Sequence, residues 1–467
     1  MLAVPLGMTA GAATPNPWHK IGAAPDNFDQ PGLVVDADGT LHVLWVQPGT
    51  NNTANVIHTP ASLGGVLGTP TTVQSGWAEI EAVPDLVSGP SGLQAFWGGI
   101  RSLDSTETNT DTNLATAPSS GGPWTLHQGN VAKGPGDYSS NIGAALGAAG
   151  TPLLSWAAGA SGVFTHAGLD PATQNYDVQG QLGGCCGYDP DIAYDPVSGQ
   201  AWIAWVSNAT NHAGVYVQQI DATTAAPMGS AVRLPNSATS YAGTPDQFDP
   251  QIERTPIVAT KNGVFVAYTG GYPSTNKILL WKLSAAGPSA AFFIGTAGEM
   301  QKPGITSDSV GRLWVTWTQN GVIHARRSNP TDIRWGANVS LARAPSDSCD
   351  TLEEVTPAAA TTRLDVVGTW TCTSGNEMLL AQLFPGLSLV ASPAHFSGKT
   401  KVMFTVTDAD VPVPGAKVSA DGKSATTNAS GKAVIVLGPT SKKQRVTATA
   451  TKLHFTAGKA FVYLVPK

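Results

Sequence analysis

Half of the acidic residues in this 467-residue chain are concentrated in seven short segments. The segments are 25–31, 77–85, 134–141, 182–191, 244–254, 298–304 and 346–357, and together they span 64 residues. Only Arg254 and Lys302 oppose their negative charge. The segments hold 16 of the 32 acidic residues: Asp26, Asp29, Glu79, Glu81, Asp85, Asp137, Asp189, Asp191, Asp246, Asp249, Glu253, Glu299, Asp347, Asp350, Glu353 and Glu354.

Paired carboxyl groups are the residues that cleavage of a glycosidic bond requires. One carboxyl must stay protonated as the acid and the other ionised as the nucleophile or base, at a separation of about 5 to 10 Å. Crowding of like charges raises the pKa of one partner and so supplies the acid. The candidate catalytic pairs are Asp189 with Asp191, Asp246 with Glu253, and Glu353 with Glu354.

The same segments contain side chains that could contact a sugar. Aromatic rings offer flat apolar faces for stacking. The adjacent cysteines of LGGCCGYDPD (182–191) could form a disulfide between neighbours, which would present a small apolar plate or, alternatively, only stiffen the loop. The candidate substrate-binding residues are Tyr138, Cys185, Cys186, Tyr188, Phe248 and Arg254.

Two other interpretations of the acidic segments stay open. Asp before Pro, as at Asp189 and Asp249, often caps a turn by accepting hydrogen bonds from nearby backbone N–H groups. Clustered carboxylate oxygens also suit a structural Ca²⁺ ion. The alternatives are therefore turn chemistry with a structural ion, cleavage of a glycan, and binding of a glycan without cleavage.

Seven repeats indicate how the chain would bring these segments together. Each repeat has three or four short stretches of alternating apolar and polar residues, separated by Gly, Pro, Asn and Asp. About 50 residues and four antiparallel strands per unit are typical of a β-propeller blade. We therefore predict an all-β chain with a propeller over residues 15–391, of seven blades or, as the alternative, six. The repeated aromatic residues, predicted to pack between blades, are Trp45, Trp97, Trp156, Trp205, Tyr268, Trp317 and Trp370.

In such a ring, the seven acidic segments lead into the innermost strands and converge at one mouth of the central channel. The repeated phrases, such as PDIAYDPVSG before AWIAWVS, resemble sialidase-type propellers with BNR (Asp-box) repeats. APSSGGPW (117–124) and RSNPTDIRW (327–335) resemble degraded copies of the Asp-box turn. The resemblance covers about 370 residues and implies a secreted, carbohydrate-directed propeller.

Sialidase activity itself is not what the residues favour. The resembled family holds a sugar carboxylate with three arginines, and a bidentate guanidinium matches that group. Here the rim offers Arg254, with Arg101 nearby, and the F-R-I-P signature is absent. A hydrolase of neutral sugars, a polysaccharide lyase or a lectin-like protein fits the acidic rim better.

The sequence pattern changes at about residue 392. Residues 392–467 alternate apolar and polar positions with closely spaced turns, and PVPGAKVSADGKSATTNASGKAVI resembles bacterial Ig-like and carboxypeptidase-regulatory-like modules. We predict a small β-sandwich that acts as a spacer or attaches the protein to a cell surface, with direct ligand binding as the alternative.

Export is the expected fate of the chain. Residues 1–14 resemble the end of a secretory signal, with an A-x-A arrangement at Ala10 to Ala12. In an oxidising compartment we expect Cys185–Cys186 and Cys349–Cys372 disulfides, although four cysteines allow three connectivities. The formal charge of −6 and the lack of a Lys/Arg cluster argue against nucleic acid, and no apolar run is long enough to cross a membrane.

Overall fold

The protein is built almost entirely of β-strands. The computed structural model describes residues 17–25, 30–100, 111–127, 132–133, 140–157, 162–168, 176–177, 179–183, 187–207, 209, 212–237, 254–270, 276–295, 298, 300–341 and 349–466. Within these ranges the only helical elements are two single 3₁₀ turns, η1 (Thr50–Asn52) and η2 (Ala148–Gly150). None of the helical segments described there could reach across a bilayer.

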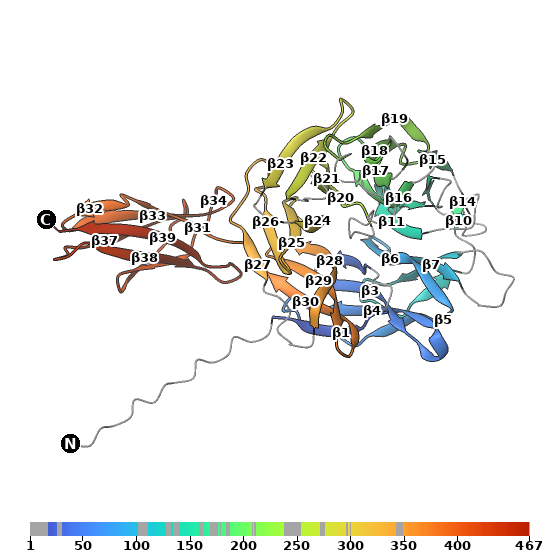
Figure 1. Ribbon diagram of the computed structural model, residues 1–467, viewed down its shortest axis with the longest axis horizontal. Coiled ribbons are helices and arrows are strands. Elements are labelled where there is room, and N and C mark those ends of the chain that lie inside the picture. The colour runs from blue at the N-terminus through green and yellow to red at the C-terminus, as the bar shows by residue number, and fades with distance from the viewer. Residues whose placement is uncertain are drawn as a thin grey trace, which may run out of the picture.

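Seven four-stranded antiparallel sheets follow one another around a ring, which confirms the predicted propeller fold (Figure 1). Each repeat of the sequence corresponds to one sheet, and the first strands contact one another in cyclic order around the axis. These first strands are β2 (Gly32–Val35), β6 (Glu79–Gly89), β11 (Ser140–Leu146), β16 (Gly187–Asp195), β20 (Ile257–Thr260), β24 (Gln301–Ser307) and β28 (Cys349–Ala360). The second strands are β3 (Leu41–Pro48), β7 (Gly92–Ile100), β12 (Pro152–Ala157), β17 (Gln200–Ser207), β21 (Gly263–Gly270), β25 (Leu313–Gln319) and β29 (Arg363–Cys372).

The outer strands complete each sheet. The third strands are β4 (Ala54–Ala61), β8 (Asp111–Ala117), β13 (Val163–Ala167), β18 (Gly214–Ile220), β22 (Lys277–Leu283), β26 (Val322–Arg327) and β30 (Gly375–Leu383). The fourth strands are β5 (Thr71–Trp77), β9 (Thr125–His127), β15 (Gly180–Leu182), β19 (Pro227–Arg233), β23 (Ser289–Gly295), β27 (Val339–Leu341) and, in the last sheet, β1 (His19–Ala23). A separate parallel pair joins β10 (Ala132–Lys133) to β14 (Tyr176–Asp177).

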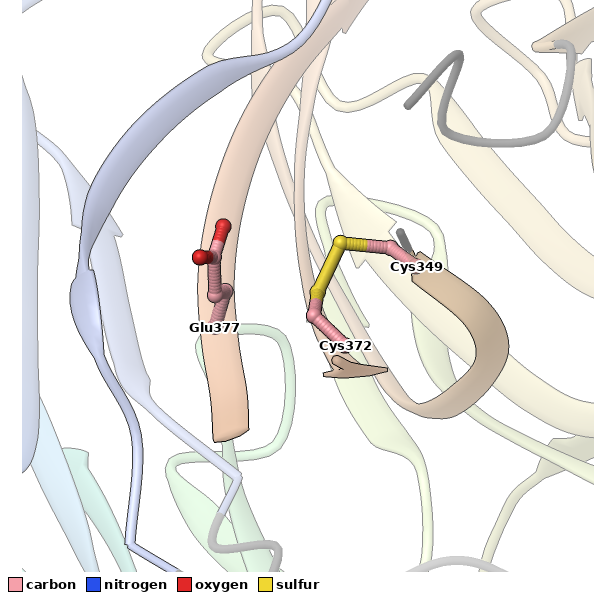
Figure 2. Close-up of side chains that lie close together, drawn as sticks. All are labelled: Cys349, Cys372 and Glu377. Atoms are coloured by element: carbon pink, nitrogen blue, oxygen red, sulfur yellow. A yellow bond between two sulfur atoms is a disulfide. The ribbon is translucent and has the colours of Figure 1, made fainter. Parts of the chain in front are cut away.

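The N-terminal strand closes the ring by pairing with the last repeat. Strand β1 lies antiparallel to β30, and Lys20 Nζ is 2.6 Å from Glu377 Oε1 across that pair. The predicted Cys349–Cys372 disulfide is confirmed in the same sheet, where it joins directly opposite positions of β28 and β29. Figure 2 shows Glu377 on the strand next to this disulfide. Both ends of the ring are thus fixed in one sheet.

Aromatic residues of the second strands fill the spaces between neighbouring sheets. Trp97 packs with β3 residues of the preceding sheet, and Trp156 packs with Phe96 in the same way. All seven repeated aromatics are at most 3% exposed. The predicted packing of these aromatics between blades is confirmed, because each one lies in a hydrophobic cluster shared by two consecutive sheets.

The C-terminal residues form a separate β-sandwich with its own hydrophobic core. Side chains alternate along its strands, so that Val402, Phe404 and Val406 point inward while Lys401 and Met403 are exposed. One sheet contains β31 (Ser388–Ser392), β33 (Thr400–Asp408), β34 (Val411–Pro412) and β37 (Lys432–Leu437). The other contains β32 (His395–Ser397), β39 (Gly458–Val465), β38 (Gln444–Thr451), β35 (Lys417–Ala420) and β36 (Lys423–Thr426).

A buried ionic contact joins the sandwich to the sixth sheet of the propeller. Asp408, at the end of β33, pairs with Arg327 and lies 2.8 Å from Nη2 of Arg312. All three side chains are buried. Removing one partner of a buried ion pair leaves an unpaired buried charge and strongly destabilises the folded protein. The contact therefore holds the two domains in a fixed arrangement.

Candidate functional site

The channel of the ring contains a cavity of about 210 Å³. Residues from all seven first strands line it, so the cavity lies where the sequence predicts that the acidic segments converge. The charged groups that line it, among the residues that the structure describes, are Asp85, Asp191 and Arg254.

Asp85 and Arg254 form a brace across this cavity. Nη1 of Arg254 lies 2.6 Å from Oδ1 of Asp85, and Nη2 donates a 3.0 Å hydrogen bond to the carbonyl of Pro31. Asp85 also accepts hydrogen bonds from the backbone N–H groups of Leu86 (2.8 Å) and Ala144 (2.7 Å). The brace therefore connects the first, second, third and fifth repeats, and both oxygens of Asp85 are bonded within the protein.

Asp191 occupies the corresponding position of the fourth repeat. Its Oδ1 accepts a 2.8 Å hydrogen bond from the backbone N–H of Ile192. Burial raises the pKa of Asp191 to about 8; the nearby Asp85 adds to this rise, while Arg254 and the Ile192 N–H oppose it. A pKa raised to about 8 favours the protonated form of Asp191 at neutral pH, and this side chain lines the same cavity as Asp85.

A glycine opposite Asp191 makes room for its carboxyl group. A Cβ atom placed on Gly143, in β11, would lie 2.7 Å from Oδ1 of Asp191 and 2.7 Å from its Cα. Any larger residue at this position would collide with the acid or displace it. Close approach of the third and fourth repeats thus depends on glycine here.

The other described candidates have internal partners at the rim. Oδ1 of Asp189 accepts a 2.6 Å hydrogen bond from Asn141, and the carbonyl of Asp189 accepts one from the N–H of Thr255. Oε1 of Glu353 accepts a 2.9 Å hydrogen bond from the hydroxyl of Thr371. Lys302 donates to the backbone carbonyl of Glu353 and lies 4.0 Å from Oε1 of Glu354. The carboxyl groups of these three acids thus have side-chain partners within the protein, and none of the three acids is among the residues that line the cavity.

Tyr188 is half-buried in β16, opposite Val206, and is not among the residues that line the cavity. Six of the predicted site residues lie outside the described residues. They are Tyr138, Cys185, Cys186, Asp246, Phe248 and Glu253.

Asp85 is the residue whose role the sequence did not predict. The signal for it was present, because Pro84-Asp85-Leu86 and Pro190-Asp191-Ile192 are the same phrase in two repeats. Equivalent positions of a ring face a common axis, and the first and sixth repeats have Gly32 and Gly304 there. The acids of this phrase are therefore the ones that enter the channel.

A second hollow, of about 320 Å³, lies beside the fourth sheet. Trp205 and Tyr216 form one wall, with ring centres 5.8 Å apart and planes 21° from parallel. Ser207 and His212 supply polar groups, and Gly183 lies at the edge.

A metal ion has one candidate ligand group among the described residues. The sulfur atoms of Cys349 and Cys372 and the carboxylate of Glu377 lie within 4.8 Å of one another (Figure 2). Both sulfur atoms belong to the disulfide, so they are not thiolate ligands. The Ca²⁺ ion considered from the acidic segments stays a prediction.

No protein-family model matches the chain, and neither does any curated protein. Among solved structures, a chain of the mitotic checkpoint complex is 13% identical, with a TM-score of 0.44 over 82% of this chain and 99% of that one. Hydrazine synthase of Kuenenia stuttgartiensis is 10% identical (TM-score 0.45; 81% and 99%), and an endo-arabinase from Bacteroides thetaiotaomicron is 11% identical (TM-score 0.32; 78% and 98%). Similarity this low does not extend to function.

Proposed function

We propose that the protein binds a carbohydrate at the channel mouth and cleaves a glycosidic bond there, with Asp191 as the proton donor. The observation that carries the proposal is that two acidic side chains, Asp85 and Asp191, line one cavity, where burial raises the pKa of Asp191. Environments that separate the protonation states of two neighbouring acids are how enzymes assign acid and base roles at neutral pH.

The three charged groups of the cavity have different roles in this proposal. Asp191 donates its proton to the departing sugar oxygen. Asp85 disfavours loss of that proton through its own negative charge, and Arg254 holds Asp85 in place. Asp246 and Glu253, in the segment directly before Arg254, are our candidates for the base or nucleophile.

Product release from a panel of polysaccharides tests the proposal. New reducing ends or unsaturated sugars, identified by mass spectrometry, would establish cleavage and separate a hydrolase from a lyase. Asp191→Asn should lower turnover by about 100-fold or more, because that is the usual contribution of a positioned general acid. Turnover of the wild type should also fall above about pH 8, where Asp191 loses its proton.

Asp195→Asn is the matched control. Asp195 lies at the other end of the same strand, where Oδ1 accepts from the N–H of Val197 and Oδ2 from the hydroxyl of Ser198. Its replacement should leave turnover unchanged. Failure to detect any product across a broad panel would contradict the proposed cleavage.

Binding without cleavage is the second candidate function. Among the described residues that line the cavity, Asp191 can donate a proton, but both oxygens of Asp85 are bonded within the protein, so this acid is a poor nucleophile; that lining favours binding. In that case a glycan would bind without product release, and Asp191→Asn would change affinity alone. In either case we propose an extracytoplasmic location, which the Cys349–Cys372 disulfide supports.

A further inference from the structure

The two domains carry opposite charge. Residues 392–467 contain eleven Lys and Arg residues against three Asp residues, whereas residues 1–391 contain 15 Lys and Arg against 29 Asp and Glu. The formal charges are therefore +8 and −14, and the whole-chain value of −6 conceals the difference. Charge asymmetry between parts of a chain indicates an interaction surface.

Contacts with the propeller neutralise two of the three acids of the sandwich. Asp408 is buried against Arg312 and Arg327, and Asp410 lies 3.7 Å from Nε of Arg334. Asp421 is the remaining acid. The surface of the sandwich away from the junction is consequently almost purely basic.

One sheet of the sandwich presents a face of polar side chains. Along β38 the residues Val446, Ala448 and Ala450 point into the core, so the intervening Thr447 and Thr449 point outward. Three basic residues share this outward face, since Arg445 pairs with Tyr463, Lys459 with Thr449, and Lys417 with Thr451 across the strands.

Aromatic rings lie on the same face. Phe461 is 45% exposed, and the guanidinium of Arg445 lies 4.6 Å from its ring centre. Tyr463 stacks on His395, with ring centres 4.6 Å apart and planes 5° from parallel. We call this outward surface, with Lys417, Arg445, Lys459, Phe461 and Tyr463, the basic face.

We propose that the basic face binds an anionic polysaccharide. Its three cations complement carboxylate or sulfate groups, and its threonine hydroxyls can bond to sugar hydroxyls. The exposed ring of Phe461 and the ring of Tyr463 provide surfaces on which sugar rings stack. Hydroxyl groups and exposed rings on a sheet surface match an extended sugar chain better than the grooves of duplex DNA, and the polar residues of this outer surface differ from the apolar face that enters a membrane.

This inference is independent of the proposed cleavage, since it concerns a different domain and a different charge. The test uses the full chain and polygalacturonate, a carboxylated polysaccharide, with neutral dextran as the reference. Affinity electrophoresis should show retardation by polygalacturonate that weakens as salt is raised, because exposed charges are screened. Dextran should cause no retardation.

Substitution at the basic face should weaken this retardation. The triple variant Lys417→Gln, Arg445→Gln and Lys459→Gln should bind polygalacturonate at least about tenfold more weakly, equivalent to about 1.4 kcal/mol. Lys401→Gln with Lys432→Gln removes two exposed charges from the opposite sheet and is the matched control. Asp191→Asn should bind like the wild type, which separates this proposal from the proposed function.

Three results would overturn the proposal. The first is equal retardation of the wild type and the triple variant. The second is equal retardation by dextran. The third is preferential binding to duplex DNA or to vesicles containing phosphatidylserine, which would assign the basic charge to another class of partner.

Discussion

The propeller and the sandwich place their charged residues in opposite ways. In the propeller, Asp85, Asp308 and Asp365 are buried and bonded to neighbouring repeats or arginines. In the sandwich, most of the basic side chains that the structure describes are exposed. These buried acids of the propeller therefore stabilise the ring, whereas the exposed basic residues of the sandwich are available to bind a partner.

Asp408 is the exception that tests this comparison, because it is a sandwich residue that contributes to internal structure. Buried groups owe their stability to specific partners, whereas exposed groups contribute little to folding. Net charge alone thus says nothing about function until burial is known. Substitutions at buried and exposed positions should separate the two uses of charge.

Asp408→Ala should have the largest effect on stability. It leaves Arg312 and Arg327 buried without their shared carboxylate, and removal of one partner from such an ionic group costs about 3–5 kcal/mol. Chemical denaturation should show a lower free energy of unfolding. Proteolysis should accelerate near residues 384–388, where the chain passes from β30 of the propeller to β31 of the sandwich.

Asp410→Asn is the control for this substitution. Asp410 and Arg334 are 75% and 67% exposed, so their ion pair should contribute less than about 0.5 kcal/mol. Equal effects of the two substitutions would show that burial does not distinguish the junction from the surface.

Removal of the Cys349–Cys372 disulfide should destabilise the propeller alone. A cross-link between residues 23 positions apart stabilises by about 3 kcal/mol in the chain-entropy model. Calorimetry of the Cys349→Ala, Cys372→Ala double variant should show a lower transition for the propeller and an unchanged one for the sandwich. A shift of both transitions would mean that the domains unfold as one unit.

The repeats made the ring predictable, because each aromatic recurs at a position that the fold buries. Trp97 and Trp370 are both in second strands, as their shared phrases indicate. The pairing of β1 with β30 was not predictable in the same way. His19–Ala23 has no distinctive phrase, and its partner lies more than 350 residues away.

The site was predictable as a region rather than as a mechanism. The acidic segments indicated the channel mouth, and Asp191 was among the candidates. The sequence does not show which acids are bonded within the protein. That depends on distances across the ring, such as the one between Asp85 and Arg254, and no local sequence pattern encodes them. The opposite charges of the domains were visible in the sequence but cancelled in the total.

Asp191→Asn should remove a pH dependence that is specific to the propeller. The folded state binds a proton up to about pH 8, whereas an ordinary Asp releases it near pH 4. Because the folded state then holds more protons than the unfolded state, wild-type stability should fall as pH rises from about 4 to about 8. Denaturation at several pH values should show a shallower decline for the variant. An identical slope would contradict the raised pKa.

The triple substitution on the basic face should have the smallest effect on stability and a large one on binding. Lys417, Arg445 and Lys459 are exposed, and the main internal interaction that the substitution removes is the stacking of Arg445 on Phe461. Such an exposed cation–π pair contributes about 0.5–1 kcal/mol, so the free energy of unfolding should change by about 1 kcal/mol or less. Denaturation and polygalacturonate binding should be measured on the same preparation. A large drop in stability would show that these residues, like Asp408, stabilise the fold. Weak binding by a stable variant would show that the exposed charges of the sandwich bind a partner.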